Sequence, residues 1–272
     1  MSDLTVDWAA LLVDAVTKPG VISTAYSRFW DYSTGNQLLA LWQCMLRSLE
    51  PGPINTFRGW IDLGRHVKRG EKALTLCMPV TVKRKTRSED ALVENSNPPL
   101  KEQTFTRFVH RPNWFVLCQT EGKEYVPTEV PEWNESYALA SLHVERVMFQ
   151  HLNGNAQGYA IDRQVAVSPL AALPHKTLFH EIAHVILGHT EELRRMDDDE
   201  HTPVNLREVE AECVALICSE SLKLDGSEFC RGYIQRWLGN ESIPDRSTQR
   251  IFKAADQILK AGRSHETEAC FP

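Results

Sequence analysis

The chain has few of the features that mark secreted, membrane or fibrous proteins. Its seven cysteines are scattered and include no C-x-x-C pair, which argues against a disulfide framework or a cysteine zinc site and favours a reducing compartment. No apolar run approaches the roughly 18 residues that a membrane-spanning helix needs. The start, Met1-Ser2-Asp3-Leu4, lacks the basic and apolar parts of a secretory signal. We therefore expect a cytoplasmic protein with no membrane partner.

The composition leaves a globular protein. Hydrophobic residues make up 42% and charged residues 24% of the 272 residues, with 14 Gly and 14 Pro, which excludes a disordered chain, a coiled coil and a collagen. This length suffices for one large domain or for two of ordinary size.

Charge is unevenly distributed along the chain. The formal net charge is -6, yet residues 57–111 hold 12 basic and 6 acidic side chains. A basic segment on an otherwise acidic protein is typical of a surface that binds a polyanion. A solvated sheet face is the alternative explanation for the same pattern.

Hydrophobic periodicity predicts an α+β fold in two parts. In the first half, the pattern predicts helices at 4–16 and 34–49, a strand at 73–82, a long loop at 88–103, and a strand pair within 104–119 interrupted at Arg111-Pro112-Asn113. In the second half, it predicts a strand at 158–167 and helices at 137–151, 174–187, 205–222, 226–238 and 247–261.

A polar segment separates the two parts. Residues 121–136 carry Pro127, Pro131 and five acidic side chains, which is typical of a linker. We place this linker at 126–136. We therefore expect a small α+β nucleic-acid-binding domain at 1–125 and a second domain at 137–272.

The strongest chemical signal is the H-E-x-x-H motif at residues 180–184. On a helix, His180 and His184 share a face about 5–6 Å apart, where two imidazoles can bind one zinc ion. Glu181 is offset from that face and can contact a metal-bound water as the catalytic base. The alternative is a buried histidine pair without metal, but a metal explains all three polar residues on an otherwise apolar helix.

A later helix offers the third ligand. Glu208 and Glu212 lie four residues apart and share a face with small alanines, whereas Glu210 points roughly the opposite way. We assign Glu208 as the metal ligand and Glu212 as the acceptor of a hydrogen bond from a ligand histidine. The reverse assignment and a helix of exposed glutamates are the alternatives. His189 follows the motif helix and is interpreted as a surface or capping residue.

Basic and aromatic residues are interleaved in the first half, as in proteins that bind single-stranded DNA without sequence preference. Core packing is the alternative for Trp60 and Trp114, and an apolar helical stripe predicts a core position for Trp42. No helix-turn-helix or zinc-finger spacing indicates duplex recognition. The candidate DNA-binding residues are Arg58, Trp60, Arg65, Lys68, Arg69, Lys72, Lys83, Arg84, Lys85, Arg107 and Arg111.

Several segments resemble those of a known family. Residues 158–190, which contain HEIAH, and E-x-x-A-E at 208–212 resemble the zincin-like metallopeptidase domain of ArdC-type antirestriction proteins and, more distantly, the ImmA/IrrE-type peptidases. Motifs of the first half resemble the single-stranded-DNA-binding domain of the same family, in the same order. These motifs are Ser33-x-x-Asn36-Gln37-Leu38-Leu39, Gly59-Trp60, Gly64-Arg65-x-Val67-Lys68-x-Gly70-Glu71-Lys72, and Phe115 through Gln119-Thr120-Glu121-Gly122.

The resemblance implies a single-stranded-DNA-binding N-terminal domain joined to a C-terminal zincin-like domain that holds Zn2+. Such proteins are typically carried by conjugative plasmids and other mobile elements, and they protect incoming DNA from host restriction. If the site is active, a host protein is the expected substrate, strand 158–167 is a candidate to pair with it, and Tyr159 and Tyr233 are candidate oxyanion partners. The loop at 86–103 departs from the family and receives no role.

Two alternatives to this function remain at the level of sequence. One is a regulatory zinc metalloprotease whose basic N-terminal domain docks a protein or DNA partner. The other is a DNA-binding protein whose metal is purely structural. Both need the same ligand side chains, so the sequence does not separate them.

Overall fold

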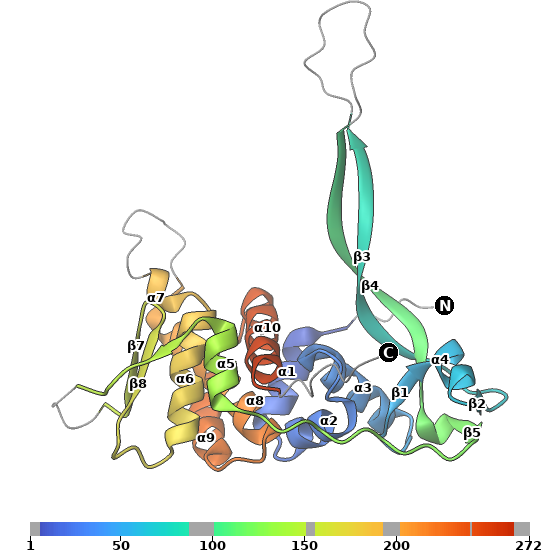
Figure 1. Cartoon of the computed structure of the whole chain (residues 1–272), viewed down its shortest axis with the longest axis horizontal. Helices are drawn as coiled ribbons and strands as arrows, with labels where there is room; N and C mark the ends of the chain where they lie inside the picture. Colours follow the sequence, from blue (N-terminus) through green and yellow to red (C-terminus); the bar gives the residue numbers. More distant parts are fainter. Residues whose placement is uncertain (1–5, 87–100, 151–155, 193–201, 240, 264–272) are drawn as a thin grey trace, which may run out of the picture. The chain divides into compact units, whose positions relative to one another are not determined.

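The computed structural model describes residues 6–86, 101–150, 156–192, 202–239 and 241–263. Helices and strands are mixed in it, so the expected α+β class is confirmed (Figure 1). The chain forms two compact units: a smaller one, Ile54–Lys123, and a larger one, Thr5–Pro53 together with Glu124–Pro272.

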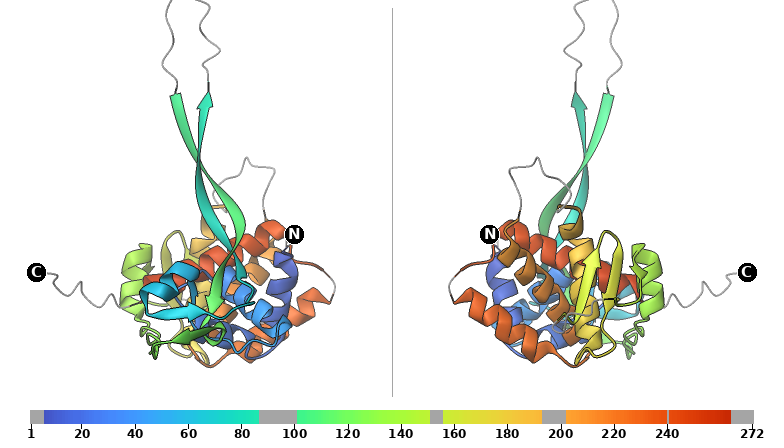
Figure 2. Two further views of the ribbon diagram at one scale, coloured as in Figure 1. Left: turned by 90° about the vertical axis from the view of Figure 1, so that its right-hand side faces the viewer. Right: turned by 90° about the vertical axis from the view of Figure 1, so that its left-hand side faces the viewer.

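The smaller unit is built from two antiparallel sheets and a short helix. One sheet has the strand order β1-β4-β3, and the other pairs β2 with β5. Strands β3 and β4 pair from Leu74 to Thr86 and continue as a long twisted ribbon past the rest of this unit (Figure 2). The elements are β1 (Ile54–Thr56), α4 (Phe57–Asp62), β2 (Arg65–Val67), β3 (Leu74–Thr86), β4 (Lys101–Val116), the 3-10 turn Leu117–Gln119 and β5 (Thr120–Gly122).

Strand β4 runs unbroken through residues 111–113, where we expected an interruption. Leu74 pairs with Trp114, whereas the next residue, Thr75, pairs with Pro112. Asn113 is therefore the extra residue of a β-bulge, which accommodates a proline without ending the strand. The prediction of two separate strands within 104–119 was wrong for this reason. The expected loop at 88–103 falls mostly outside the described residues.

Several motif residues of the smaller unit have structural partners. Gln119 is 1% exposed, and its amide donates to Glu71 Oε2 at 2.8 Å and to the Lys72 carbonyl at 3.0 Å. The guanidinium of Arg65 donates to the hydroxyl of Thr120 at 2.8 Å and to its carbonyl at 3.1 Å. These bonds tie β2 and the following turn to β5, so this part of the motif specifies the fold.

The larger unit surrounds helix α8, in which every residue from Val209 to Ser221 is buried. Helices α6, α9 and α10 pack against α8, and a small sheet of order β6-β8-β7 packs on α6 with β7 at its edge. No helix among the described residues is long and apolar enough to cross a membrane. The helices are α1 (Trp8–Thr17), α2 (Val21–Phe29), α3 (Thr34–Leu46), α5 (Glu135–Leu142), α6 (Pro174–Ile186), α7 (His189–Glu192), α8 (Val204–Ser221), α9 (Ser227–Leu238) and α10 (Asp245–Ala261); the strands are β6 (Glu145–Arg146), β7 (Gly158–Ile161) and β8 (Gln164–Val167).

The compact units differ from the expected domains 1–125 and 137–272. The first helices belong to the larger unit, because α1 packs against α9 and α10 and α2 packs against α8. Part of the expected linker 126–136 is also anchored there: Trp133 donates to the Ile258 carbonyl at 3.1 Å, and its ring lies 5.1 Å from that of Phe179. Which unit carries which function stays a prediction.

Other elements also differ from expectation. The helix expected at 137–151 ends at Leu142, and Glu145–Arg146 form strand β6 instead. Residues 158–167 form a hairpin of β7 and β8 that turns at Asp162, which has a φ of 55°. Helix α2, which the periodicity did not lead us to expect, begins after Gly20, a residue with a φ of 81°. That positive φ is easily reached only by glycine and marks the turn into the helix.

Candidate functional site

Helix α6 carries the H-E-x-x-H motif as expected. Pro174 occupies its first turn, where a missing N–H costs nothing, and Gly188 follows its end with a φ of 78°. Phe179 and Ile182 are fully buried and fix the rotation of the helix. The two histidines consequently face the start of α8.

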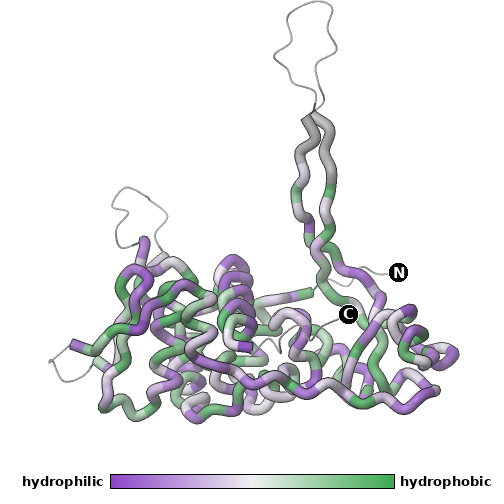
Figure 3. The backbone as a smooth tube through the Cα atoms, viewed as in Figure 1, coloured by the Kyte–Doolittle hydropathy of each residue, from purple (hydrophilic) through white to green (hydrophobic). Residues whose placement is uncertain are grey.

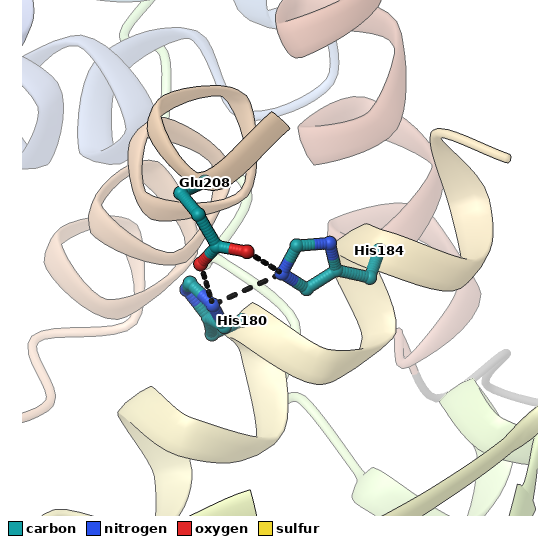
Figure 4. A group of neighbouring side chains, drawn as sticks. All are labelled: His180, His184 and Glu208. Atoms are coloured by element: carbon teal, nitrogen blue, oxygen red, sulfur yellow. Dashed lines mark hydrogen bonds and ion pairs between the residues drawn. The ribbon is translucent and has the colours of Figure 1, made fainter. Parts of the chain in front are cut away.

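The structure brings His180, His184 and Glu208 together. The Nε2 atoms of the two histidines lie 3.1 Å apart, and the Glu208 carboxylate lies 3.4 Å from His180 Nε2 and 3.6 Å from His184 Nε2. Figure 4 shows the histidines on successive turns of one helix, with the carboxylate of Glu208 directed at both from a neighbouring helix.

These distances suit one metal ion. Ligand atoms about 2.0–2.1 Å from a tetrahedral ion lie about 3.3 Å from one another. The three side chains are a group that could hold an ion, since one ligand atom of each lies within 4.8 Å of the others. Two imidazoles and one carboxylate also leave a fourth position open, as in catalytic zinc sites.

Glu212 lies on the outer side of His180. Its Oε2 accepts from His180 Nδ1 at 2.9 Å, and its Oε1 lies 2.8 Å from Nζ of Lys176. Because a carboxylate only accepts, Nδ1 of His180 carries a proton, and Nε2 is the nitrogen that would give up its own proton to bind a metal. Glu208 and Glu212 thus occupy the positions that the sequence predicted, and ligation itself stays a prediction.

The charges of the site are strongly coupled. Burial alone would lower the pKa of His180, but hydrogen bonds to Glu208 and Glu212 raise it to about 9. Burial also raises the pKa of Glu212, yet the bond to His180 and the charge of Lys176 bring it down to about 2. An incoming ion would therefore displace a proton from His180.

Glu181 is seated against strand β7. Its side chain is 8% exposed, and burial raises the pKa of its carboxyl. A Cβ at Gly158 would lie 2.9 Å from Glu181 Oε1 and 2.7 Å from Thr177 Cγ2. Only glycine at 158 therefore lets the carboxylate keep this position.

The interpretation of His189 as a surface residue was wrong. His189 is 3% exposed, and Glu210, which we expected to point away from the site, is fully buried. Nδ1 of His189 lies 3.0 Å from Nδ1 of His184, and its Nε2 lies 2.8 Å from Glu210 Oε2. The guanidinium of Arg250 lies 3.3 Å from the same carboxylate oxygen.

This chain of contacts fixes the tautomers. Glu210 only accepts, so His189 donates from Nε2 and accepts at Nδ1, which makes His184 donate from Nδ1. Burial lowers the pKa of His189 and so favours this neutral form. Nε2 of His184 can therefore offer its lone pair to an ion held between the two histidines and Glu208, as a metal ligand requires.

We expect His189→Ala to weaken metal binding about 10–100-fold, as when an outer hydrogen-bond partner of a ligand is removed. The reason is that His184 would lose the acceptor that sets its tautomer. Competition with a chromophoric chelator would measure the affinity. His175→Ala, at an exposed position of α6, is the matched control and should leave the metal affinity unchanged. Equal metal affinities of the two variants would contradict the role proposed for His189.

Cavities flank the motif on both sides. One of about 250 Å³ is lined by residues that include Glu181, His184 and Glu208. A second of about 480 Å³ is lined by residues that include His180, Glu181 and Phe229. Ala160 of β7 lines the first and Gly158 of β7 lines the second, so the edge strand passes along both.

The two candidate oxyanion partners have different surroundings. Tyr233 on α9 interacts electrostatically with the site, because burial and the charges of Glu208 and Glu212 raise its pKa. The hydroxyl of Tyr159 lies 3.4 Å from the carbonyl of Met148 instead.

In the smaller unit, Trp60 is not available for stacking. It is 1% exposed, and its indole N–H donates to the Phe115 carbonyl at 2.8 Å; the prediction that it contacts DNA was wrong. The guanidinium of Arg65 donates hydrogen bonds to Thr120 of β5. Lys68, though exposed, donates to the Cys118 carbonyl at 2.9 Å.

The other candidates are spread over this unit. Five are exposed on α4, on the turn after β2 and on β4, and the side chains at 83–85 fall outside the described part. Three exposed aromatic residues were missed: Phe57, Phe105 and Phe108, at 53%, 47% and 68%. The exposed basic candidates are Arg58, Arg69, Arg107 and Arg111, and Lys72 is exposed beside them.

Trp114 packs in the core of the smaller unit, at 6% exposed, in line with the alternative given for it. Trp42 of the larger unit is 38% exposed, so its predicted core position was wrong. The apolar stripe of α3 is wider than the face that the other helices cover.

Comparison with known proteins finds a family model and solved structures that are similar to this chain. Residues 13–111 match the family model described as the N-terminal domain of anti-restriction factor ArdC. The metal-free crystal structure of the antirestriction protein ArdC from plasmid R388 superposes with a TM-score of 0.51 at 18% identity, covering 94% of each chain. Its Mn(II)-bound structure gives a TM-score of 0.47 at 18% identity, covering 94% and 96%. None of the curated proteins compared with the chain matches it.

Proposed function

We propose that the chain is an ArdC-type antirestriction protein, because residues 13–111 match the family model of the ArdC N-terminal domain and the chain shares the ArdC fold. In this proposal it binds single-stranded DNA and protects the incoming DNA of a mobile element from host restriction. We further propose that residues 54–123 bind the DNA and that the larger unit carries a zincin-like metallopeptidase site.

The convergence of His180 Nε2, His184 Nε2 and the Glu208 carboxylate within 3.1–3.6 Å carries the metal part of this proposal. We propose Zn2+ as the ion and these three side chains as its ligands. A bound zinc ion polarises a peptide carbonyl and lowers the pKa of a bound water to about 7.

Glu181 is the proposed catalytic base. Its buried carboxyl has a raised pKa, which brings the group closer to the range in which it takes up and returns a proton. In this role Glu181 takes the proton of the attacking water and delivers it to the leaving amine. Gly158 keeps the carboxylate in place for both steps.

An extended segment of a host protein is the proposed substrate. Strand β7 is the edge of its sheet, so one side of its backbone can pair with an added strand. The same strand passes both cavities beside Glu181, which gives a peptide room on each side of the scissile bond.

The ribbon of β3 and β4 supports the proposal that residues 54–123 bind single-stranded DNA. Phe105, Arg107 and Arg111 lie at alternate positions of β4 and share one face of the ribbon. All three are exposed, and hydrophobic and hydrophilic stretches are interspersed along the ribbon (Figure 3). Cationic and aromatic side chains on one face suit phosphates and unpaired bases.

We expect affinity for single-stranded DNA to exceed that for duplex and to fall steeply with salt, with a log–log slope of about -0.7 for each phosphate neutralised. The double variant Arg107→Gln/Arg111→Gln should reduce that slope by about 1–1.5. Phe105→Ala should weaken binding with little change in slope, at about 1–3 kcal/mol per lost stack. Fluorescence anisotropy from 50 to 300 mM salt measures all of these quantities.

Arg146→Gln, in the larger unit and outside the ribbon, is the control and should leave the slope unchanged. Trp60→Phe should also bind normally if the protein remains folded, because the indole is buried. Equal or tighter binding to duplex DNA would reject the single-strand proposal.

The regulatory metalloprotease is the second candidate, because two cavities meet at Glu181 beside an edge strand. In that case Glu181→Gln would abolish protection from restriction while leaving DNA binding intact. If protection depends on DNA binding alone, the same variant would protect as well as the wild type does.

A further inference from the structure

Arg207 stands out among the cations around the site. It precedes Glu208 in the first turn of α8 and lines the cavity of about 250 Å³ together with Glu181 and His184. Its Nε atom is buried and has no hydrogen-bond partner within the part of the chain that the structure describes. A buried donor without an acceptor costs about 1–3 kcal/mol, and more when the group is charged.

The neighbouring charges are paired with other groups. Glu212 has Lys176 at 2.8 Å, and Glu210 has the guanidinium of Arg250 at 3.3 Å. Glu208 faces the two histidines at 3.4 and 3.6 Å. The pKa of Glu181 is shifted mainly by burial and by the charges of His180, His184, Glu208 and Lys176, and Arg207 is not among these groups.

Arg207 therefore adds a positive charge that no described carboxylate balances. With a divalent ion on the three proposed ligands, Glu208 and Glu181 would together offset the ion, and the charge of Arg207 would remain. This cavity consequently favours an anion from outside the protein.

The shape of the Arg207 guanidinium limits the class of anion that fits it. A guanidinium presents planar pairs of N–H donors that match a carboxylate bidentately. A cavity of about 250 Å³ has the volume of roughly eight water molecules at about 30 Å³ each. It is large enough for a short acidic side chain or a chain-terminal carboxylate, and too small for a folded partner.

We propose that Arg207 binds a carboxylate of the peptide substrate next to the scissile bond, and so makes the site selective for an acidic residue or a chain end there. This inference rests on the proposed metallopeptidase function and names part of its substrate. Arg207 is the residue that determines specificity, while Glu181 and the ligands carry the chemistry.

Two small probes test the proposal without a known substrate. Acetohydroxamate binds a zinc ion through its hydroxamate alone, and N-hydroxysuccinamate adds a carboxylate two methylenes away. The zinc-loaded full chain should bind the carboxylate probe at least 10-fold more tightly, as measured by isothermal titration calorimetry. Arg207→Gln should abolish this preference and leave the affinity for acetohydroxamate unchanged.

Arg207→Lys should retain part of the preference, because it keeps the charge and loses the bidentate geometry. Arg236→Gln, at an exposed position of α9, is the matched control and should behave as the wild type. Thermal melting of each variant verifies that it is folded.

Equal affinity of the wild type for the two probes would overturn the proposal, as would a preference that persists in Arg207→Gln. If the zinc-loaded chain bound neither probe, the proposed metal site would itself be wrong, and the inference would fall with it. Binding of acetohydroxamate alone therefore separates the failure of this inference from failure of the proposed function.

Discussion

Replacing Glu208 with alanine is expected to leave the purified protein without tightly bound zinc. Its carboxylate faces both histidine Nε2 atoms at 3.4 and 3.6 Å, and two imidazoles alone bind zinc weakly. The neighbouring His180 and His184 hold the pKa of Glu208 well below its usual range, so its charged form is the one present at neutral pH. We expect a loss of affinity of at least about 1,000-fold, equal to about 4 kcal/mol.

Two further variants make this result specific. Glu181→Gln should keep zinc and remove any hydrolysis, because the side chain is offset from the ligand face. Glu212→Ala should lower the affinity by about 10–100-fold, since only the partner of His180 Nδ1 is lost. Metal content by mass spectrometry distinguishes the three proteins.

If Glu212→Ala were the metal-free protein and Glu208→Ala retained zinc, the two roles would be exchanged. Zinc in both variants would place the third ligand elsewhere in the chain. Because two histidines and a carboxylate also accept other divalent ions, the same measurements should include manganese and iron.

Removing one partner of the buried Glu220–Arg231 ion pair is expected to destabilise the larger unit strongly. The two side chains are 9% and 8% exposed and bonded to each other. Glu220 also accepts from the backbone N–H of Gly20 at 2.6 Å, and Arg231 donates to the carbonyl of Val16 at 2.7 Å. The pair therefore joins α8 and α9 to the turn between α1 and α2.

Arg231→Met would leave Glu220 buried with its charge unmatched, at a cost of about 3–5 kcal/mol in the free energy of unfolding. For a unit of this size that corresponds to a melting temperature lower by roughly 6–20 °C. Urea denaturation followed by circular dichroism measures the change. Lys18→Ala, which breaks the exposed pair with Asp14, is the control and should cost less than about 1 kcal/mol.

The double variant Arg231→Met/Glu220→Leu gives a stricter test. If the unmatched charge is the cause, removing both charges should restore much of the lost stability. A double variant as unstable as the single one would instead assign the loss to packing.

The long periodic helices were predictable from sequence because their apolar spacing repeats over several turns. The limits of α6, α8 and α9 lie within one residue of those expected. The missed helix α2 is only nine residues long. Its buried residues Ile22, Ala25, Tyr26 and Phe29 do follow helical spacing, so its pattern was present in the sequence and was overlooked. The compact units differ from the expected domains because periodicity identifies helices but does not say which of them pack together.

The juxtaposition of His180 and His184 was predictable from spacing alone, since a four-residue step on a helix puts both on one face. His189 and Glu210 could not be placed in this way. They meet because the chain turns at Gly188 and brings α7 back against α8. A buried histidine or glutamate indicates a paired polar site, but the sequence does not show that these two residues are buried.

The DNA-binding candidates were less predictable for a related reason. Composition identifies basic and aromatic residues but not the direction of their side chains. Trp60 points into the core, whereas Phe105 and Phe108 face solvent on β4. A strand with two exposed faces has no buried side from which the alternation could be read.

The order in which the ribosome releases the chain has a consequence for the larger unit, whose sequence is split by the smaller one. Helices α1–α3 emerge first, with apolar residues such as Leu12 and Phe29 that are fully buried only in the finished fold. Their partner helix α10 ends at Ala261, and at about 5–20 residues per second roughly 10–45 s separate the two. The smaller unit can fold during that interval, while the first helices must wait with their apolar faces uncovered. We therefore expect the first 50 residues to be the segment on which chaperones act during synthesis.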